Sequence, residues 1–178
     1  MARPELTGVL LVGGASTRFG SPKALARLNG ELLAERAWRL LGEACTERFA
    51  FGKAADALDL PFDVRDDGTE TRAALAGIVA GLRAASSDLV VVVPVDMPFL
   101  TPGLLHDLAA ACEDAAAPEA GPLPAAYRKT ALPVLERRLA EGTFALHEAL
   151  DELRAARLSL DEARLANVNI PDDLRRLG

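Results

Sequence analysis

The sequence predicts an α/β fold, in which a single doubly wound and mostly parallel sheet of the Rossmann-like kind has helices on both faces. Apolar runs of strand length alternate with segments of helical periodicity along the 178 residues, and this alternation implies right-handed βαβ crossovers. The run LVVVVPV at 89–95 has no polar alternation, which is typical of a central parallel strand covered on both faces. We therefore expect ligands to bind beyond the carboxyl ends of the strands.

The first expected strand and helix cover residues 6–12 and 32–44. The strand is a continuous apolar run that leads directly into a glycine-rich loop. The helix has apolar side chains three and four positions apart, which is the period of one helix face. These side chains are Leu33, Ala37, Leu40, Leu41 and Ala44.

Two weaker strands, expected at 48–51 and 62–65, precede a helix over 73–85. This helix is rich in Ala and Leu, and its glycines Gly77 and Gly81 lie four positions apart. Residues at that spacing share one helix face, so we expect the helix to pack through small residues.

The next helix is expected to begin after Thr101 and to extend to about Cys112, because Thr101 is a good N-cap and Pro102 suits the first helical position. Residues 115–124 are rich in Ala, Pro and Gly and are expected to form a loop. The remaining expected elements are a strand at 123–127, helices at 130–141 and 144–153, a strand near 164–168 and a short terminal helix.

Length and charge favour one acidic, cytoplasmic domain spanning residues 1–178. The 26 acidic and 20 basic residues give a net charge of −6, which argues against a protein that coats nucleic acid. The apolar run at 89–95 is far shorter than the ~20 residues that span a bilayer, and no apolar leader precedes the first strand. We therefore expect no nucleic-acid or membrane partner. Cys45 and Cys112 form no CxxC pair and are expected to be reduced thiols.

The charge is unevenly distributed along the chain. Residues 13–27 hold three cations and no acid, whereas residues 56–70 hold six acids and one cation. A small cationic loop in an acidic protein is consistent with a focused anion site. Composition alone leaves a chance surface cluster equally open.

The loop LLVGGASTRFGSPK at 10–23 follows the first strand directly. Its glycines allow backbone N–H groups to approach a phosphate, while Arg18 and Lys23 supply positive charge. The loop is neither a Walker A motif, because Ser21 follows Gly20, nor a G-x-G-x-x-G fingerprint. From the residues alone, it is either a phosphate-binding loop or a glycine-rich turn with two solvated cations.

The pattern L-x-G-G-x-S-x-R-x-G-x-x-K resembles the signature loop of nucleotidyltransferases with a nucleotide-diphospho-sugar transferase-like fold. Within them it is most similar to the molybdenum cofactor guanylyltransferases. The resemblance implies that the loop wraps a nucleoside triphosphate, although Pro22 stands where the family usually has Asp. The residues implied to meet the base and ribose are Leu11, Val12, Gly13 and Gly14. Those implied to meet the triphosphate, with catalytic roles, are Arg18 and Lys23.

Asp96 follows the valine-rich run, so we expect its carboxylate to project into the ligand crevice. Mg²⁺ prefers oxygen ligands and commonly uses one or two carboxylates with substrate phosphates, which makes Asp96 a candidate metal ligand and catalytic residue. The alternative is a cap of the following helix, but Thr101 holds the better cap position. The motif P-x-D-x-P-[FY]-[LI], present here at 94–100, is the metal-binding motif of the family that the chain resembles.

Other segments extend the resemblance. The stretch 73–82 is similar to a family G-P-L-A-G-I-x-x-G-L stretch, with Ala73-Ala74 replacing Gly-Pro. Asp66 corresponds to a family Asp that contacts the nucleotide, Asp67 is its rival, and both could instead be solvated. No Asn stands near 51–52, where the family often has one.

Near the end of the chain, NVNIPDDL at 167–174 looks like the family motif N-[VI]-N-T-P-E-[DE]-L. On a strand, Asn167 and Asn169 would share one face and could address an acceptor or a metal-bound water. They could equally tie down a terminal turn. By resemblance, Tyr127 and Arg128 lie beside the acceptor site.

The resemblance implies Mg²⁺-dependent transfer of GMP from GTP to molybdopterin-bound molybdenum cofactor. The pair Gly13-Gly14 favours GTP, because cytidylyl relatives tend to have Ala-Gly there. Two alternatives stay open: cytidylyl or other nucleotidyl transfer to this or another phosphorylated acceptor, and a catalytically weak nucleotide-binding accessory protein. Transient partners would be proteins that deliver the cofactor or mature molybdoenzymes.

Overall fold

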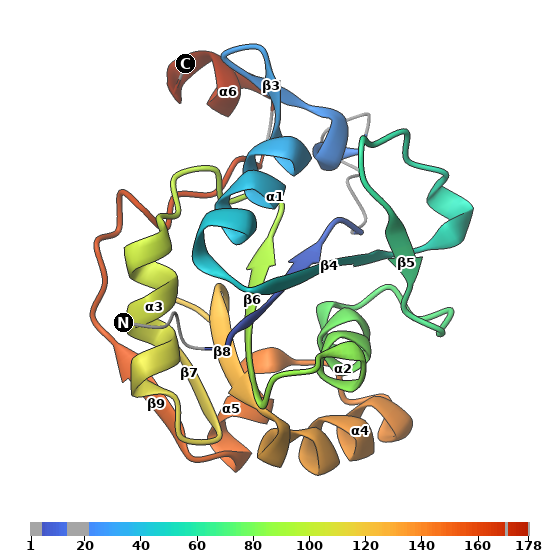
Figure 1. Cartoon of the computed structure of the whole chain (residues 1–178), viewed down its shortest axis with the longest axis vertical. Helices are drawn as coiled ribbons and strands as arrows, with labels where there is room; N and C mark the ends of the chain where they lie inside the picture. Colours follow the sequence, from blue (N-terminus) through green and yellow to red (C-terminus); the bar gives the residue numbers. More distant parts are fainter. Residues whose placement is uncertain (1–4, 14–21, 170, 178) are drawn as a thin grey trace.

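The computed structural model describes residues 5–13, 22–169 and 171–177, which form one seven-stranded sheet, a two-stranded hairpin and flanking helices (Figure 1). The strand order in the sheet is β5-β4-β1-β6-β8-β7-β9. The strands are β1 (Thr7–Leu11), β4 (Glu47–Gly52), β5 (Val64–Asp66), β6 (Leu89–Pro94), β7 (Ala115–Pro118), β8 (Ala125–Arg128) and β9 (Ala155–Leu158).

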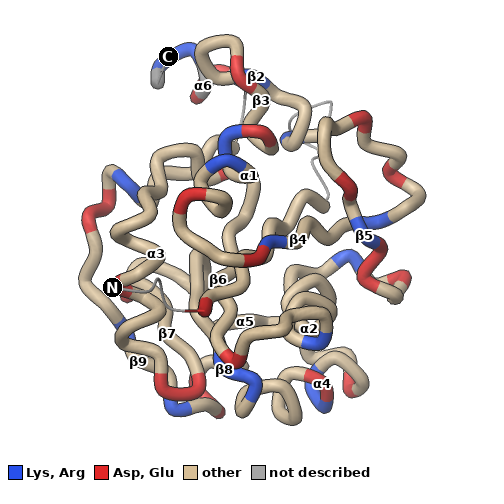
Figure 2. Tube along the Cα trace, viewed as in Figure 1, with Lys and Arg blue, Asp and Glu red and all other residues tan. Residues whose placement is uncertain are grey.

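The sheet is mostly parallel, as predicted. β5, β4, β1 and β6 run in one direction, β8 is antiparallel to both β6 and β7, and β9 is parallel to β7. All five residues of β1 are buried, and so are the four central valines of β6. In Figure 2 most charged residues lie on loops, helices and the outer strands, whereas β1 and β6 carry none. The two central strands are therefore covered on both faces.

Helices cover both faces of this sheet, which also confirms the prediction. Val91 and Val93 of β6 belong to one apolar cluster and Val90 and Val92 to another, because successive side chains of a strand point to opposite faces. Figure 1 shows α1 and α3 on one side and α2 and α4 on the other. The helices are α1 (Leu33–Ala44), α2 (Ala74–Ala84), α3 (Pro102–Ala111), α4 (Leu132–Glu141), α5 (Leu146–Glu152) and α6 (Pro171–Leu177). None of the described helices is long and apolar enough to cross a bilayer.

The elements expected over the first hundred residues lie within two residues of those observed, but two later predictions are wrong. Residues 115–118 form strand β7 rather than part of a loop. Its three alanines lack the branched side chains that mark a strand, and it forms because it lies between β8 and β9. The last strand is β9, at 155–158, whereas 164–168 is not a strand.

The sequence reading also missed a hairpin, formed by β2 (Arg27–Leu28) and β3 (Glu31–Leu32). Its two-residue turn is Asn29-Gly30, and both residues have positive φ, 50° and 83°. Asn-Gly is the dipeptide that such turns favour, so the signal was present in the sequence. Short 3₁₀ turns complete the chain: η1 (Lys23–Leu25), η2 (Ala54–Asp56) and η3 (Lys129–Ala131).

Helix α2 packs closely on β1 because of its glycines. A Cβ added at Gly81 would lie 2.5 Å from Val9 Cγ2 and 3.0 Å from Val9 Cγ1, and Val9 is fully buried. We expect Gly81→Ala to lower the free energy of unfolding by about 1–3 kcal/mol, because the extra methyl group overpacks the core. Urea denaturation measures this change.

Gly103 in α3 provides the matched control, because a Cβ there would meet nothing within 4 Å. Gly103→Ala should leave stability unchanged or raise it by up to about 1 kcal/mol, since Ala is the better helix former. A Gly81→Ala variant as stable as the parent would contradict the close packing of α2 on β1.

Candidate active site

The carboxyl ends of β1, β4, β5 and β6 meet at one edge of the sheet, where two cavities open. The second of them has a volume of about 380 Å³. The first cavity is lined by Leu11, Gly13, Phe51, Gly52, Lys53, Asp67, Arg72, Ala73, Ala74 and Gly77. The second cavity is lined by Pro94, Asp96, Met97, Ala120, Gly121, Pro122, Leu123, Leu165 and Asn167.

Close approach of β1 and β4 shapes the first cavity. A Cβ on Gly52 would lie 2.9 Å from Val12 Cγ2, so a glycine is needed where the two strands end. The Val12 N–H donates to the Phe51 carbonyl at 3.0 Å, and the Val12 side chain is buried in the core. Leu11 and Gly13, both predicted to meet the nucleotide, line this cavity. Gly14 and Arg18 lie outside the described residues.

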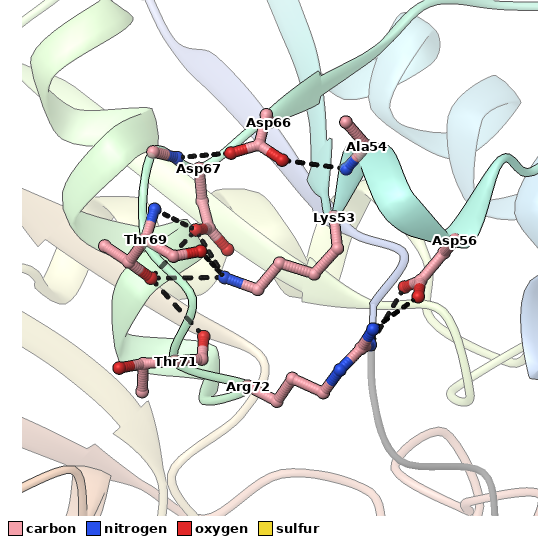
Figure 3. A network of polar contacts seen from close by, with 9 residues as sticks. Lys53, Ala54, Asp56, Asp66, Asp67, Thr69, Thr71 and Arg72 are labelled. Carbon is pink, nitrogen blue, oxygen red and sulfur yellow. Dashed lines mark hydrogen bonds and ion pairs between the residues drawn. The ribbon is translucent and has the colours of Figure 1, made fainter.

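The polar wall of the first cavity is an ion pair from two adjacent strand ends (Figure 3). Lys53 Nζ lies 2.6 Å from Asp67 Oδ1, and the two side chains are only 10% and 6% exposed. β4 and β5 are parallel with Gly52 opposite Asp66, which brings the residues that follow them together. The cavity therefore has a buried charged pair beside its apolar wall.

Asp66 takes no part in this pair and forms separate hydrogen bonds (Figure 3). Its carboxylate accepts hydrogen bonds from the Ala54 N–H at 2.7 Å and the Gly68 N–H at 2.8 Å. These two backbone donors lower the pKa of Asp66. The rival candidate Asp67 lines the first cavity, whereas Asp66 is not among the residues that line it. The nucleotide contact predicted for Asp66 therefore stays a prediction.

Arg72 lies at the rim of the first cavity, near the start of α2. Its guanidinium binds the Asp56 carboxylate through two hydrogen bonds of 2.6 and 3.1 Å. The Arg72 side chain is 45% exposed, so this pair is a solvent-facing contact. It joins the turn after β4 to the segment before α2.

The second cavity borders a cluster around Asp96. Lys23 Nζ lies 3.1 Å from Asp96 Oδ2 and 3.3 Å from Asn169 Oδ1, so three segments distant in sequence meet here. The Asp96 side chain is 24% exposed. The predicted catalytic pair Lys23 and Asp96 is therefore brought together in this structure.

The chain segment after β9 closes over this cluster. The Val168 N–H donates to the Asp96 backbone carbonyl at 2.8 Å, and Val168 is fully buried. Asn167 lines the second cavity and Asn169 contacts Lys23, so both amides lie near Asp96 although the segment is not a strand.

The structure argues against an acceptor role for Tyr127 and Arg128. Arg128 pairs with Leu89, at the end of β6 opposite Asp96, and its guanidinium binds Asp88. Tyr127 is fully buried, and its hydroxyl has no hydrogen-bond partner among the described residues. Burial raises the pKa of Tyr127.

The residues around Asp96 fit a Mg²⁺ ion that is shared with a substrate. Within the described parts of the chain, no three His, Cys, Asp or Glu side chains gather to form a complete metal site. Mg²⁺ is commonly held by one or two carboxylates together with substrate phosphates, and Asp96 supplies one such carboxylate. The Lys23 ammonium already forms an ion pair with this carboxylate, so a positive charge is accommodated beside Asp96.

Two residues of the first cavity were missed by the sequence reading. Lys53 follows the predicted strand at 48–51, and Arg72 precedes the predicted helix at 73–85. The rule that ligands bind beyond the carboxyl ends of parallel strands would have selected Lys53 once β4 was accepted as a strand.

A doubly wound sheet with a Lys–Asp pair and two cavities at its strand ends is the layout of an α/β nucleotidyltransferase. The chain matches the family model described as MobA-like NTP transferase domain over residues 8–158, and it belongs to this family.

Relatives and solved structures agree with this assignment. A probable molybdenum cofactor guanylyltransferase of Chloroflexus aggregans is 36% identical over 191 aligned positions, which cover 96% of this chain and 92% of the relative. A molybdenum cofactor guanylyltransferase of Desulfosudis oleivorans is 30% identical, covering 94% and 86%. The crystal structure of molybdopterin-guanine dinucleotide biosynthesis protein A from Archaeoglobus fulgidus superposes with a TM-score of 0.81 at 28% identity, covering 96% of both chains.

Proposed function

We propose that this nucleotidyltransferase transfers GMP from GTP to molybdopterin-bound molybdenum cofactor and releases pyrophosphate. The observation that carries the proposal is the contact of Lys23 with Asp96 beside two cavities. Asp96 lines the second cavity, and the preceding Val95 donates its N–H to Leu11, which lines the first. The names of the relatives in Chloroflexus aggregans and Desulfosudis oleivorans support the choice of substrates.

In this proposal the guanine base occupies the first cavity and the acceptor the second. The second cavity, at about 380 Å³, lies within the usual size of small-molecule sites. Leu11 and Gly13 would contact the base side of the nucleotide, which leaves the triphosphate beside Lys23 and Asp96. Asn167 would face the acceptor, since it lines the second cavity.

The reaction needs no covalent nucleophile from the protein. An oxygen of the acceptor phosphate bonds to the α-phosphorus of GTP, the bond from that phosphorus to the bridging oxygen breaks, and pyrophosphate departs with its electron pair. The acceptor phosphate is already anionic, so the protein aligns the two phosphates and stabilises the developing charge. Lys23 would donate to the phosphate oxygens. Mg²⁺ held by Asp96 and the phosphates would supply Lewis-acid stabilisation of charge on oxygen.

Nucleotide preference tests the proposal. Purified protein with Mg²⁺ and molybdenum cofactor is expected to release pyrophosphate with GTP, and at least about tenfold more slowly with CTP, because the two bases present different donors and acceptors. An enzyme-coupled pyrophosphate assay measures both rates. Equal rates would contradict the assignment of guanine, and GTP binding without turnover would favour the accessory role. Contacts with proteins that deliver the cofactor remain a prediction from resemblance.

A further inference from the structure

The Lys53–Asp67 pair lies in the first cavity, but the proposed reaction assigns it no part. All three donors of the Lys53 ammonium are engaged: Nζ lies 2.6 Å from Asp67 Oδ1, 2.6 Å from the Thr69 carbonyl and 3.1 Å from Thr69 Oγ1. The ammonium therefore has no donor left for a ligand unless one of these bonds breaks. Its position makes Lys53 a group that acts through Asp67.

The two oxygens of Asp67 differ sharply. Oδ1 accepts from Lys53 Nζ and also from the N–H and the hydroxyl of Thr69, each at 3.0 Å. All the hydrogen bonds that the described residues donate to the Asp67 carboxylate go to Oδ1, and none reaches Oδ2 from the residues drawn in Figure 3. Asp67 lines the first cavity, and its side chain is only 6% exposed. One of its carboxylate oxygens accepts three hydrogen bonds, and the other is available to accept one from a ligand.

A buried carboxylate is costly unless a cation and hydrogen bonds compensate for its lost hydration. Lys53 and Thr69 supply that compensation entirely through Oδ1. The carboxylate is thereby held in one orientation, and Oδ2 is kept for an N–H donor entering the cavity. Among nucleobases, guanine presents two adjacent donors, N1–H and the 2-amino group, whereas cytosine and adenine each place a bare ring nitrogen beside their amino group.

We propose that Lys53 is a positioning residue for base selection: with Thr69 it orients Asp67 so that Oδ2 accepts from the donor edge of guanine. This inference rests on the proposed function, because it assigns guanine to the first cavity. A purine that lacks the 2-amino group should bind more weakly to the native protein, and this penalty should disappear when Lys53 no longer holds Asp67.

Calorimetric titration of GTP and ITP with Mg²⁺, without acceptor, tests the inference, since ITP differs from GTP only by the missing 2-amino group. The native protein is expected to bind GTP at least about tenfold more tightly than ITP, the effect of one hydrogen bond to a charged group. Lys53→Met should reduce that ratio to within about threefold, and Lys53→Arg should restore most of it because the charge is retained. In the transfer assay, Lys53→Met should raise KM for GTP with little change in kcat.

Two further variants keep the test decisive. Lys129→Met is the matched control, because Lys129 donates to the Ala85 carbonyl away from both cavities, and it should preserve the GTP-to-ITP ratio. Thr69→Val keeps the ion pair and removes only hydroxyl contacts, so it should lower the ratio partially even if Lys53→Met folds poorly. A Lys53→Met or Thr69→Val protein with the native ratio overturns the inference alone. A native protein that binds neither nucleotide overturns the proposed function and the inference together.

Discussion

Asp96→Asn is expected to reduce nucleotidyl transfer by at least about 10²–10³-fold, the usual effect of removing one group that stabilises transition-state charge. The amide keeps the shape of the side chain but lacks the charge that would hold Mg²⁺ against the triphosphate. The backbone contact from the Val168 N–H to the Asp96 carbonyl does not involve the side chain, so the fold should be retained. The measurement is kcat for pyrophosphate release, together with the thermal unfolding midpoint.

Glu119→Gln is the matched control for this variant. Glu119 is exposed and adjoins the residues that line the second cavity without lining it. The same acid-to-amide change there should leave kcat unchanged. Full activity in Asp96→Asn would refute the role of Asp96 in holding the metal.

Lys23→Met is expected to lower kcat by about 10²-fold or more and to raise KM for GTP, because the ammonium would contact the triphosphate in both the ground and the transition state. Lys23→Arg should recover part of the loss, since it keeps the charge but changes the donor geometry. Steady-state kinetics with GTP varied separate the two parameters.

Lys129→Met serves as the control for charge removal, because this lysine donates to the Ala85 carbonyl near the amino end of β6. It should show native kinetics. If Lys23→Met retained native kcat and KM, the contact of Lys23 with Asp96 would be a structural ion pair without a part in catalysis.

The central half of the fold could be predicted because its strands carry their own signal. The valines of β6 identify a buried parallel strand without any knowledge of its neighbours. β7 could not be predicted in this way, since its alanines have little strand preference and it forms only between β8 and β9. The segment at 164–168 resembles a strand in sequence but is not one. Its Val168 N–H donates to the Asp96 carbonyl, which lies beyond the end of β6.

The site was predictable where a motif fixes a residue at a strand end. Asp96 and Lys23 were both selected from the sequence, and the structure brings them within 3.1 Å. The choice between Asp66 and Asp67 could not be made, because neighbouring residues face opposite ways and only the register of β4 and β5 decides which one faces the cavity. The same register determines that Lys53 reaches Asp67, so this pair has no signature in the sequence.

The most direct test of guanylyl transfer is the identity of the product. Purified protein is incubated with Mg²⁺, GTP, CTP and molybdenum cofactor together, and the cofactor is analysed by mass spectrometry alongside pyrophosphate release. The account predicts the guanine dinucleotide form of the cofactor, with one pyrophosphate released for each GMP transferred. A cytosine dinucleotide form, or unmodified cofactor with intact GTP, would contradict it.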